Sequence, residues 1–371
     1  MPDILNFTRA ELSQLITELG YASYRAEQIM RWVYHQNVCD FDKMANLPKE
    51  MRVKLAKQFS FSNPIVQSES ISHCGTIKWL IGCDEKNAVE TVYIPDKKRA
   101  TLCISSQVGC ALACQFCATG MAGFLRNLST AEIISQVYFA GQRIQELSGA
   151  EVMPRISNIV FMGMGEPLLN EHNVFRAVEI LLDDLAFGLS KHRVTVSTSG
   201  IVPAMHRLAD QCQAALAVSI HAANDKTRSK LVPINRRYEV KKLIEACDYY
   251  TRITGRSITY EYVMLNNQND SVEDANALAA LLGPRHAKVN LIPYNTISSL
   301  TLKPSSTIQI EIFRRILQQK GIITTVRKTR GDDIAAACGQ LYGQVQERKK
   351  RIADYQFLAQ PNHNISSAYA D

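Results

Sequence analysis

The sequence lacks several features that would place it in a specialised class of protein. No run of apolar residues approaches the length needed to cross a bilayer, so we expect no membrane span and no membrane partner. The N-terminus lacks the basic and then apolar pattern of a secretory signal, and no stretch is of low complexity. With 46% hydrophobic and 21% charged residues, the chain of 371 residues is instead typical of a globular protein with one large domain or two smaller ones.

Cysteine, by contrast, is present ten times. Because nothing in the sequence directs the chain to secretion, we expect reduced thiols in the cytoplasm rather than a framework of structural disulfides. The formal net charge of +7 is moderate. It permits a polyanionic partner but does not require one.

Residues 1–60 have the pattern of a small helical domain. Thr8 and Glu11 match a capping box at the start of one helix. Ser23 is expected to cap a second helix, and Pro48 suits the first turn of a third. Such a domain is either a packing appendage or an accessory domain that docks RNA through its basic residues, and the sequence favours neither.

Residues 61–95 change in character and predict a short β connector. Residues 75–81 and 88–94 alternate in polarity and are rich in β-branched and aromatic side chains, which is typical of strands. Residues 84–87 are expected to form the turn between them. Pro95 is expected to end the second strand.

From residue 96 to 340, segments with a strand pattern alternate with segments of helical periodicity, which predicts a parallel sheet. The predicted strands are 100–105, 157–162, 193–198, 214–220, 258–264 and 288–292. Six units are too few for a closed eight-stranded barrel, so we expect an α/β fold built on an open, partial (βα)6 barrel. Ligands of such sheets bind at the carboxyl ends of the strands. Residues 341–371 are expected to form a C-terminal tail.

Three cysteines directly after the first barrel strand lie very close in sequence. Cys110, Cys114 and Cys117 have the spacing C-x3-C-x2-C, which brings their thiols to one soft metal centre, either zinc or an iron–sulfur cluster. Structural zinc takes four ligands, and no fourth Cys or His follows at a useful spacing. A four-iron cluster held by three thiolates leaves one iron open to a small molecule, so we favour a [4Fe–4S] cluster. Reduced core cysteines are the remaining alternative.

Polar side chains and glycines follow the later strands of the predicted sheet. Because the carboxyl ends of parallel strands meet at one edge, we expect these residues to line one pocket. Gly163 and Gly165 would let a ligand approach the backbone closely, and Glu166 would accept a hydrogen bond from an ammonium group. The predicted pocket residues are Gly165, Glu166, Ser197, Ser219, Ile220, His221 and Asn295.

The cysteine spacing resembles the signature of the radical S-adenosylmethionine (SAM) enzymes. In that family the open iron binds the amino and carboxylate groups of SAM, and one electron from the cluster cleaves SAM to a 5′-deoxyadenosyl radical. Further stretches resemble the dual-specificity RNA methyltransferase family across nearly the whole chain. They are residues 104–110, 162–170, 194–200, 261–265 and 327–341. The resemblance implies methylation of carbon 2 of a specific adenine in 23S rRNA and in certain tRNAs.

The resemblance also implies roles for three residues outside the motif. Cys338, which lies between Gly331 and Gly339 near basic residues that favour a thiolate, would take a methyl group from one SAM. A second SAM would supply the radical that activates this methyl group for addition to the base. Cys103 would release the product, leaving a Cys103–Cys338 disulfide for an electron-donating reductase system. Glu90 matches the position of the general base, and we expect the protein to act as a monomer.

Three alternative functions remain open. The antibiotic-resistance relatives methylate carbon 8 of the same adenine, although residues 166–169 and 329–332 favour the carbon 2 type. A radical SAM enzyme acting on another substrate is the second alternative, and a zinc-stabilised RNA-binding protein without catalysis is the third. Basic groups that would neutralise RNA phosphates occur at 97–99, 191–193, 236–237 and 348–351.

Overall fold

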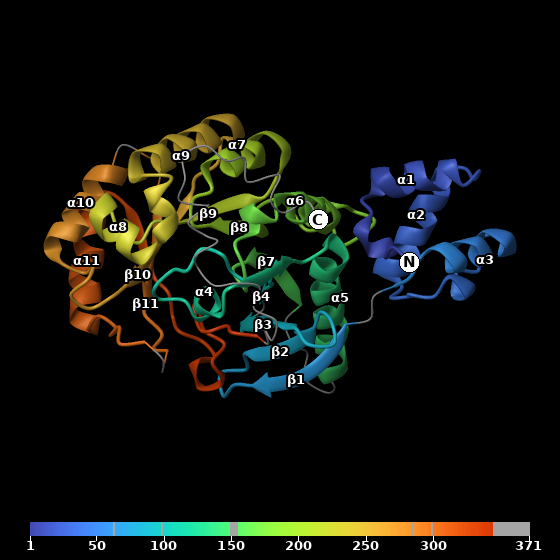
Figure 1. Ribbon diagram of the computed structural model, residues 1–371, viewed down its shortest axis with the longest axis horizontal. Coiled ribbons are helices and arrows are strands. Elements are labelled where there is room, and N and C mark those ends of the chain that lie inside the picture. The colour runs from blue at the N-terminus through green and yellow to red at the C-terminus, as the bar shows by residue number, and fades with distance from the viewer. Residues whose placement is uncertain are drawn as a thin grey trace.

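The computed structural model of the protein is an α/β fold with a helical region at its N-terminal end (Figure 1). It describes residues 1–61, 64–97, 99–148, 155–283, 285, 287–297 and 300–343. The predicted basic group at 348–351 and most of the predicted tail at 341–371 lie outside the described residues. No helix within these ranges combines the length and the apolar character needed to cross a membrane.

The N-terminal region contains three α-helices, as the sequence predicts. They are α1 (Arg9–Glu18), α2 (Tyr24–Met30) and α3 (Lys49–Gln58), with the short turns η1 (Ile4–Asn6), η2 (Arg31–His35) and η3 (Phe41–Lys43). Thr8 and Glu11 form the predicted capping box, in which each side chain accepts a hydrogen bond from the backbone N–H of the other residue.

Two details of the predicted helix starts are wrong. Ser23 precedes α2, but its backbone is already helical, so its hydroxyl does not cap the helix. Pro48 lies just before α3 with an extended backbone rather than in its first turn. Both residues still mark the helix boundaries, because each lies immediately before the first helical residue.

One ten-stranded sheet runs through the rest of the described chain, in the order β1-β2-β3-β4-β7-β8-β9-β10-β11-β12. Strands β1 to β4 pair in antiparallel fashion, and the pairs from β4 to β12 are parallel. The strands are β1 (Ile65–Ile71), β2 (Ile77–Gly82), β3 (Ala88–Asp96), β4 (Arg99–Cys103), β7 (Ile156–Phe161), β8 (Val194–Thr198), β9 (Ala215–Ser219), β10 (Thr259–Met264), β11 (Lys288–Pro293) and β12 (Ile323–Val326).

The predicted strands are all present, and two further strands, β1 and β12, form the two edges of the sheet. β1 is largely polar, and Ile323 and Val326 of β12 are exposed, so neither strand has the apolar alternation that sequence analysis requires. The prediction that Pro95 ends its strand is wrong. β3 continues to Asp96, because the fixed φ of proline is compatible with an extended backbone near a strand end.

Helices of the barrel form an arc outside the parallel strands (Figure 1). They are α5 (Thr130–Leu147), α6 (Glu171–Leu182), α7 (Val202–Gln211), α9 (Val240–Thr254), α10 (Val272–Leu282) and α11 (Thr307–Gln319). Sequence analysis did not predict the short helices α4 (Ala118–Ala122) and α8 (Asp225–Leu231), the hairpin of β5 (Gln107–Gly109) and β6 (Phe124–Asn127), or the turns η4 (Pro167–Leu169), η5 (Pro233–Arg236) and η6 (Asp332–Ile334).

Polar contacts join the N-terminal helices to the barrel helices α5 and α6. The Glu11 carboxylate pairs with Arg176 at 2.7 Å, and Arg9 pairs with Asp183. The Asn6 side chain accepts a hydrogen bond of 2.8 Å from the backbone N–H of Ala131, in the first turn of α5. The helical region therefore lies at the edge of the barrel, beside α5 and α6 (Figure 1).

Candidate active site

The loop that carries the three motif cysteines leaves the sheet through the β5–β6 hairpin. Gly109 has a φ of 76°, and a Cβ atom there would collide with the backbone of Gly123. The backbone N–H of Cys110 donates to the Gly123 carbonyl at 2.7 Å. This tight pairing turns the chain immediately after β4 and places residues 110–117, the motif loop, at the carboxyl end of the parallel strands.

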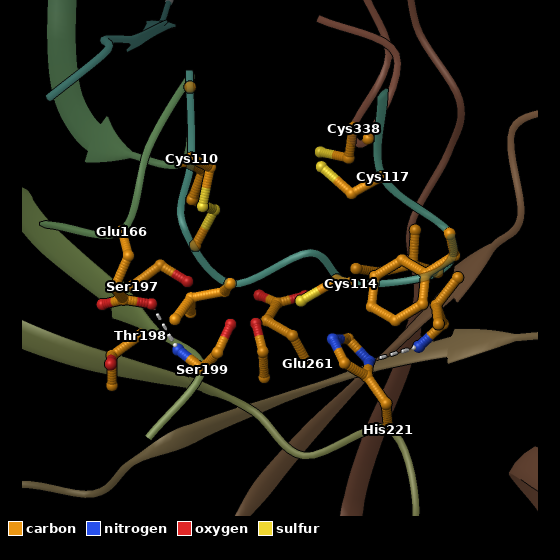
Figure 2. A pocket seen from close by; sticks show the side chains of 18 of the residues that line it. Cys110, Cys114, Cys117, Glu166, Ser197, Thr198, Ser199, His221, Glu261 and Cys338 are labelled. Carbon is orange, nitrogen blue, oxygen red and sulfur yellow. Dashed lines mark hydrogen bonds between the residues drawn. The ribbon is translucent and has the colours of Figure 1, made fainter. Parts of the chain in front are cut away.

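A cavity that opens to solvent lies beside the motif loop, with about 920 Å³ of empty space when the solvent at its mouth is included. The three cysteine side chains enter it from different sides (Figure 2). All but three of the predicted site residues line it. Those that do are Cys110, Cys114, Cys117, Gly165, Glu166, Ser197, Ser219, His221, Asn295 and Cys338.

The chemistry of the motif loop suits an iron–sulfur cluster bound through three thiolates. All ten cysteines are free. Burial, followed by the charge of neighbouring thiols, raises the pKa of Cys110 and raises that of Cys114 to about 12, so a positively charged centre is needed to hold them as thiolates. Among the described residues no three Cys, His, Asp or Glu side chains lie close enough to share one metal ion. Ligands of a cluster bind separate iron atoms and therefore lie farther apart.

Glu166 is fixed at the cavity wall by backbone donors. Its carboxylate accepts from the N–H of Ser199 at 2.8 Å (Figure 2) and from the N–H of Leu168 at 3.1 Å. Burial raises the pKa of Glu166 to about 7 despite these donors. Near neutral pH, a cationic partner beside this carboxyl group would therefore favour its ionised form.

The two glycines before Glu166 are needed for packing within the protein. A Cβ atom at Gly163 would lie 2.6 Å from the Ile104 carbonyl, and one at Gly165 would lie 2.6 Å from the Gln107 side chain. Both residues line the cavity, but their lack of a side chain is already required by the neighbouring strand ends. Close approach of a ligand is thus not needed to explain them.

His221 forms part of the cavity floor in an unusual backbone conformation, with a φ of 55°. Its Nδ1 accepts a hydrogen bond of 3.0 Å from the N–H of Val263, and its ring meets Phe116 edge-on at 4.7 Å between centroids. Burial lowers the pKa of His221 to about 3, so the ring is neutral. With Nδ1 accepting, Nε2 carries the proton and is a donor towards the cavity.

Arg228 is a structural residue of the site that sequence analysis missed. Its guanidinium is fully buried and binds strand-end carbonyls, those of Ser199 at 2.6 Å and of Ile220 and Ser219 at 3.0 Å each. It therefore joins the ends of β8 and β9 beneath the cavity. In the sequence it lies among charged residues of a short helix, and nothing there distinguishes it from a solvent-exposed arginine.

Cys338 reaches the cavity from a distant segment, residues 331–343, which we call the Cys338 segment. Its carbonyl accepts from the Asn295 side chain at 3.0 Å. The charges of Cys338, Glu261 and Cys103, in that order, act on the Arg327 guanidinium and raise its pKa. Arg327 and Cys338 line the same cavity. Burial raises the pKa of Cys103 to about 12.

Glu261 and Arg327 also line the cavity, and sequence analysis did not name them as site residues. The Glu261 carboxylate accepts from the Asn290 side chain at 2.9 Å, and burial raises its pKa. Glu261 was visible in the sequence only as part of a family-like stretch on β10. A carboxylate inside an otherwise apolar, buried strand is the signal that could have identified it.

Three predicted site residues do not line the cavity: Cys103, Ile220 and Glu90. Cys103 is the last residue of β4 and is buried. Ile220 is fully buried and supports the wall through its backbone, donating to Glu261 and accepting from Arg228. Glu90 points to the Cys338 segment, where it accepts from the N–H of Tyr342 at 2.7 Å.

The sequence matches two described families. Residues 2–60 match the ribosomal RNA large subunit methyltransferase N-terminal domain, and residues 104–279 match the radical SAM superfamily. A dual-specificity RNA methyltransferase RlmN of Ruthia magnifica subsp. Calyptogena magnifica is 48% identical over 354 residues, which cover 95% of this chain and 98% of that relative. Another, from Vesicomyosocius okutanii subsp. Calyptogena okutanii (strain HA), is 49% identical over 352 residues, covering 94% and 98%.

A solved structure is similar over the same extent. The crystal structure of a radical SAM methyltransferase from Sphaerobacter thermophilus aligns with a TM-score of 0.85 at 43% identity, covering 92% of this chain and 99% of that chain. The predicted partial-barrel fold and the predicted family are therefore confirmed. The chain belongs to the family of dual-specificity RNA methyltransferases RlmN.

Proposed function

We propose that this protein methylates carbon 2 of a specific adenine in 23S rRNA and in certain tRNAs. Its relatives are named dual-specificity RNA methyltransferases, and none of the similarities favours the carbon 8 enzyme. The observation that carries the proposal is that Cys338 lines the same cavity as the three motif cysteines. Carbon 2 of adenine is electron-poor and cannot attack the methyl group of SAM directly. A methyl carrier beside a radical-generating centre would instead provide a carbon radical that can add to carbon 2.

Membership of the radical SAM superfamily implies a [4Fe–4S] cluster and SAM. Cys110, Cys114 and Cys117 would hold the cluster, while Glu166, which lies within the family-like stretch 162–170 and lines the cavity, would hold the SAM amino group. When bound, the cluster supplies the electron that cleaves SAM to methionine and a 5′-deoxyadenosyl radical. The other predicted contacts to SAM are Gly165, Ser197, Ser219, Ile220, His221 and Asn295.

Cys338 acts first in this scheme. Its sulfur attacks the methyl carbon of one SAM, so that a carbon–sulfur bond forms, the sulfonium bond breaks and the thiol proton leaves. One hydrogen atom of the S-methyl group then passes to the radical derived from a second SAM. The methylene carbon on Cys338 bonds to carbon 2, and the adduct loses the carbon 2 proton and one electron, which balances the electron used to cleave SAM. Two SAM are consumed in each turnover.

Cys103 acts last. Its thiolate attacks the Cys338 sulfur and breaks the bond from that sulfur to the methylene carbon, which takes up a proton and becomes the methyl group of the RNA. A Cys103–Cys338 disulfide remains, and an electron-donating reductase system supplies the two electrons that restore both thiols. Arg327, which is acted on by the charges of both cysteines, supports this pairing. Glu90 is the candidate base for the carbon 2 proton.

RNA binding in this proposal uses the N-terminal helical domain, residues 1–60, and basic residues at the surface of the barrel. Lys191 and Arg236 are exposed and available to phosphates. The target adenine must leave its stack to reach the cavity. We further propose that the protein works as a monomer in the cytoplasm, where its cysteines are reduced except for the Cys103–Cys338 disulfide formed in each turnover.

The direct test is to incubate the reconstituted protein without oxygen with SAM, a reductant and either a 23S rRNA fragment or a tRNA transcript. Mass spectrometry of the digested RNA should then detect 2-methyladenosine. Detection of 8-methyladenosine instead would support the antibiotic-resistance type. Cleavage of SAM without any modified nucleoside would show that the substrate is not one of these RNAs.

A further inference from the structure

The Cys338 segment has little regular structure of its own. One 3₁₀ turn, η6, is its only helix or strand, and positive φ angles occur at Gly331, Ala335, Gly339 and Gly343. Ala335, with a φ of 50°, is in a region that an alanine adopts only at an energetic cost. The position of Cys338 must therefore be imposed by contacts with other parts of the molecule.

Glu90 holds the part of the segment that follows Cys338. One carboxylate oxygen, Oε2, accepts from the backbone N–H of Tyr342 at 2.7 Å and from that of Gly343 at 3.3 Å. Glu90 is buried on β3. Two adjacent backbone groups of the segment are thus fixed by one carboxylate oxygen.

Lys78 holds the part of the segment that precedes Cys338. Its ammonium group donates to the carbonyl of Ala335 at 3.1 Å. The same group lies 2.8 Å from Oε1 of Glu90, the carboxylate oxygen that does not face Tyr342. A chain of contacts therefore runs from Ala335 through Lys78 and Glu90 to Tyr342. It joins the residues that precede Cys338 in the sequence to those that follow it.

The β2–β3 pair explains why these two side chains meet. Glu90 is opposite Leu80, and Lys78 is opposite Val92, so Lys78 and Glu90 are diagonal neighbours on one face of the sheet. The side chain of Lys78 is 15% exposed and that of Glu90 is 10% exposed. In such a position the loss of one partner leaves the other charge poorly solvated.

We propose that Lys78 is a positioning residue, which holds Cys338 at the cavity by fixing the segment on both sides of it. The inference rests on the proposed function, since it gives Lys78 a task only if Cys338 is the methyl carrier. It also assigns a positioning task to Glu90 in this structure, because both of its carboxylate oxygens are occupied and neither lines the cavity. Glu90 would have to release Tyr342 before it could serve as a base.

Other contacts limit the effect expected from the loss of Lys78. Asn295 binds the Cys338 carbonyl, and the N–H of Ala118 donates to the Gly339 carbonyl at 2.7 Å. The Thr119 hydroxyl donates to the Leu341 carbonyl at 2.5 Å. The segment should therefore loosen without leaving the cavity when Lys78 is replaced.

The first measurement is amide hydrogen exchange of the full-length protein without added ligands. Lys78→Met keeps the length of the side chain and removes its charge, and it should speed exchange at Tyr342 and Gly343 on the order of tenfold. Lys78→Arg should restore slow exchange, because arginine can reach both acceptors. The matched control is Lys242→Met at an exposed position of α9, which should leave exchange unchanged.

The second measurement follows hydrogen transfer in protein whose Cys338 carries a deuterated S-methyl group. In the wild type, 5′-deoxyadenosine should gain deuterium from this group. In Lys78→Met a larger share should form without deuterium, since the methyl group is no longer held in place. Should the methionine variant not fold, Lys78→Gln tests the same prediction, with a smaller increase because it can still donate to Ala335.

The outcomes separate this proposal from the proposed function. Equal exchange and equal deuterium transfer in Lys78→Met and the wild type would overturn the positioning role. A failure of Lys78→Arg to restore either value would also count against it. Faster exchange in Lys78→Met, together with no deuterium transfer in the wild type, would support the positioning contacts and refute the proposed function.

Discussion

The motif loop and the Cys338 segment both bring cysteines to the cavity, but they are held in different ways. The motif loop is short, and the paired strands β5 and β6 bracket it within the same stretch of chain. The Cys338 segment depends on side chains from elsewhere, among them Ser72, which binds Asp333 at 2.6 Å, and Glu90, which is 252 residues from Tyr342. One segment is shaped locally and the other by tertiary contacts.

The difference indicates how each segment should respond to substitution. If its three thiols bind one centre, as proposed, the motif loop should lose its function when any ligand is removed, because no other residue can take its place. A segment held by several independent contacts should lose its position in steps. The predictions below test this contrast, beginning with complete loss and ending with the smallest effect.

The largest effect is expected from the motif loop. Replacing Cys110, Cys114 or Cys117 by Ala should abolish iron binding and SAM cleavage together, because each thiolate is proposed to bind one iron. Iron and sulfide analysis of protein purified without oxygen provides the measurement, and Cys212→Ala, in the core, is a matched control. Full iron content in any of the three motif variants would refute the ligand assignment.

The second-largest effect distinguishes Cys338 from Cys103, which both lie outside the motif loop. Cys338→Ala should keep its iron but never form a covalent complex with RNA, because the methyl carrier is absent. Cys103→Ala should begin the reaction and accumulate protein crosslinked to RNA through Cys338. A denaturing gel after incubation with SAM, reductant and RNA distinguishes these results. Normal turnover by either variant would show that the covalent mechanism is wrong for this protein.

The buried guanidinium of Arg228 should contribute strongly to the stability of the folded protein. Arg228→Met removes a buried guanidinium that donates to three carbonyls at the ends of β8 and β9, and should lower the free energy of unfolding by about 3 kcal/mol. Urea unfolding of the ligand-free protein measures this change. Arg315→Met, whose side chain is 71% exposed on α11, should change it by less than about 0.5 kcal/mol. Similar values for both variants would contradict the role given to Arg228.

The smallest effect is a pH dependence that arises from His221. Its pKa is about 3 in the folded protein and near 6.5 when unfolded, so only the unfolded state gains a proton as the pH falls below 6.5. The neutral ring therefore contributes stability above pH 6.5, and this contribution declines as the pH falls towards 3. Between pH 7 and pH 5.5 the free energy of unfolding should fall by about 1 kcal/mol from this residue.

His221→Asn is the matched variant for that measurement. Asparagine tolerates the positive φ, and its side-chain oxygen can accept from the N–H of Val263 as Nδ1 does. The difference in unfolding free energy between the wild type and the variant should shrink by about 1 kcal/mol when the pH is lowered from 7 to 5.5. A difference that stays constant over this range would show that His221 is not the titrating group.

Local patterns made much of the fold predictable. The capping box of Thr8 and Glu11 and the six barrel strands are all found, because caps and strand alternation involve residues close together in the sequence. The edge strands β1 and β12 were missed, because an exposed edge needs no apolar alternation. The pocket residues were predictable to the extent that they follow strand ends. Ile220 shows the limit of that rule, since its side chain points into the core and not into the cavity.

The sequence by itself determined which chemistry this chain can support. The spacing of Cys110, Cys114 and Cys117 decides that three thiols can share one centre, because a few backbone bonds confine them to the same small volume. Only the tertiary structure decided which charged residues serve the site. Arg228 and Lys78 look like ordinary surface residues in the sequence, and their partners lie on other strands and segments. Burial and long-range pairing arise only when the sheet assembles, so they leave no local pattern to read.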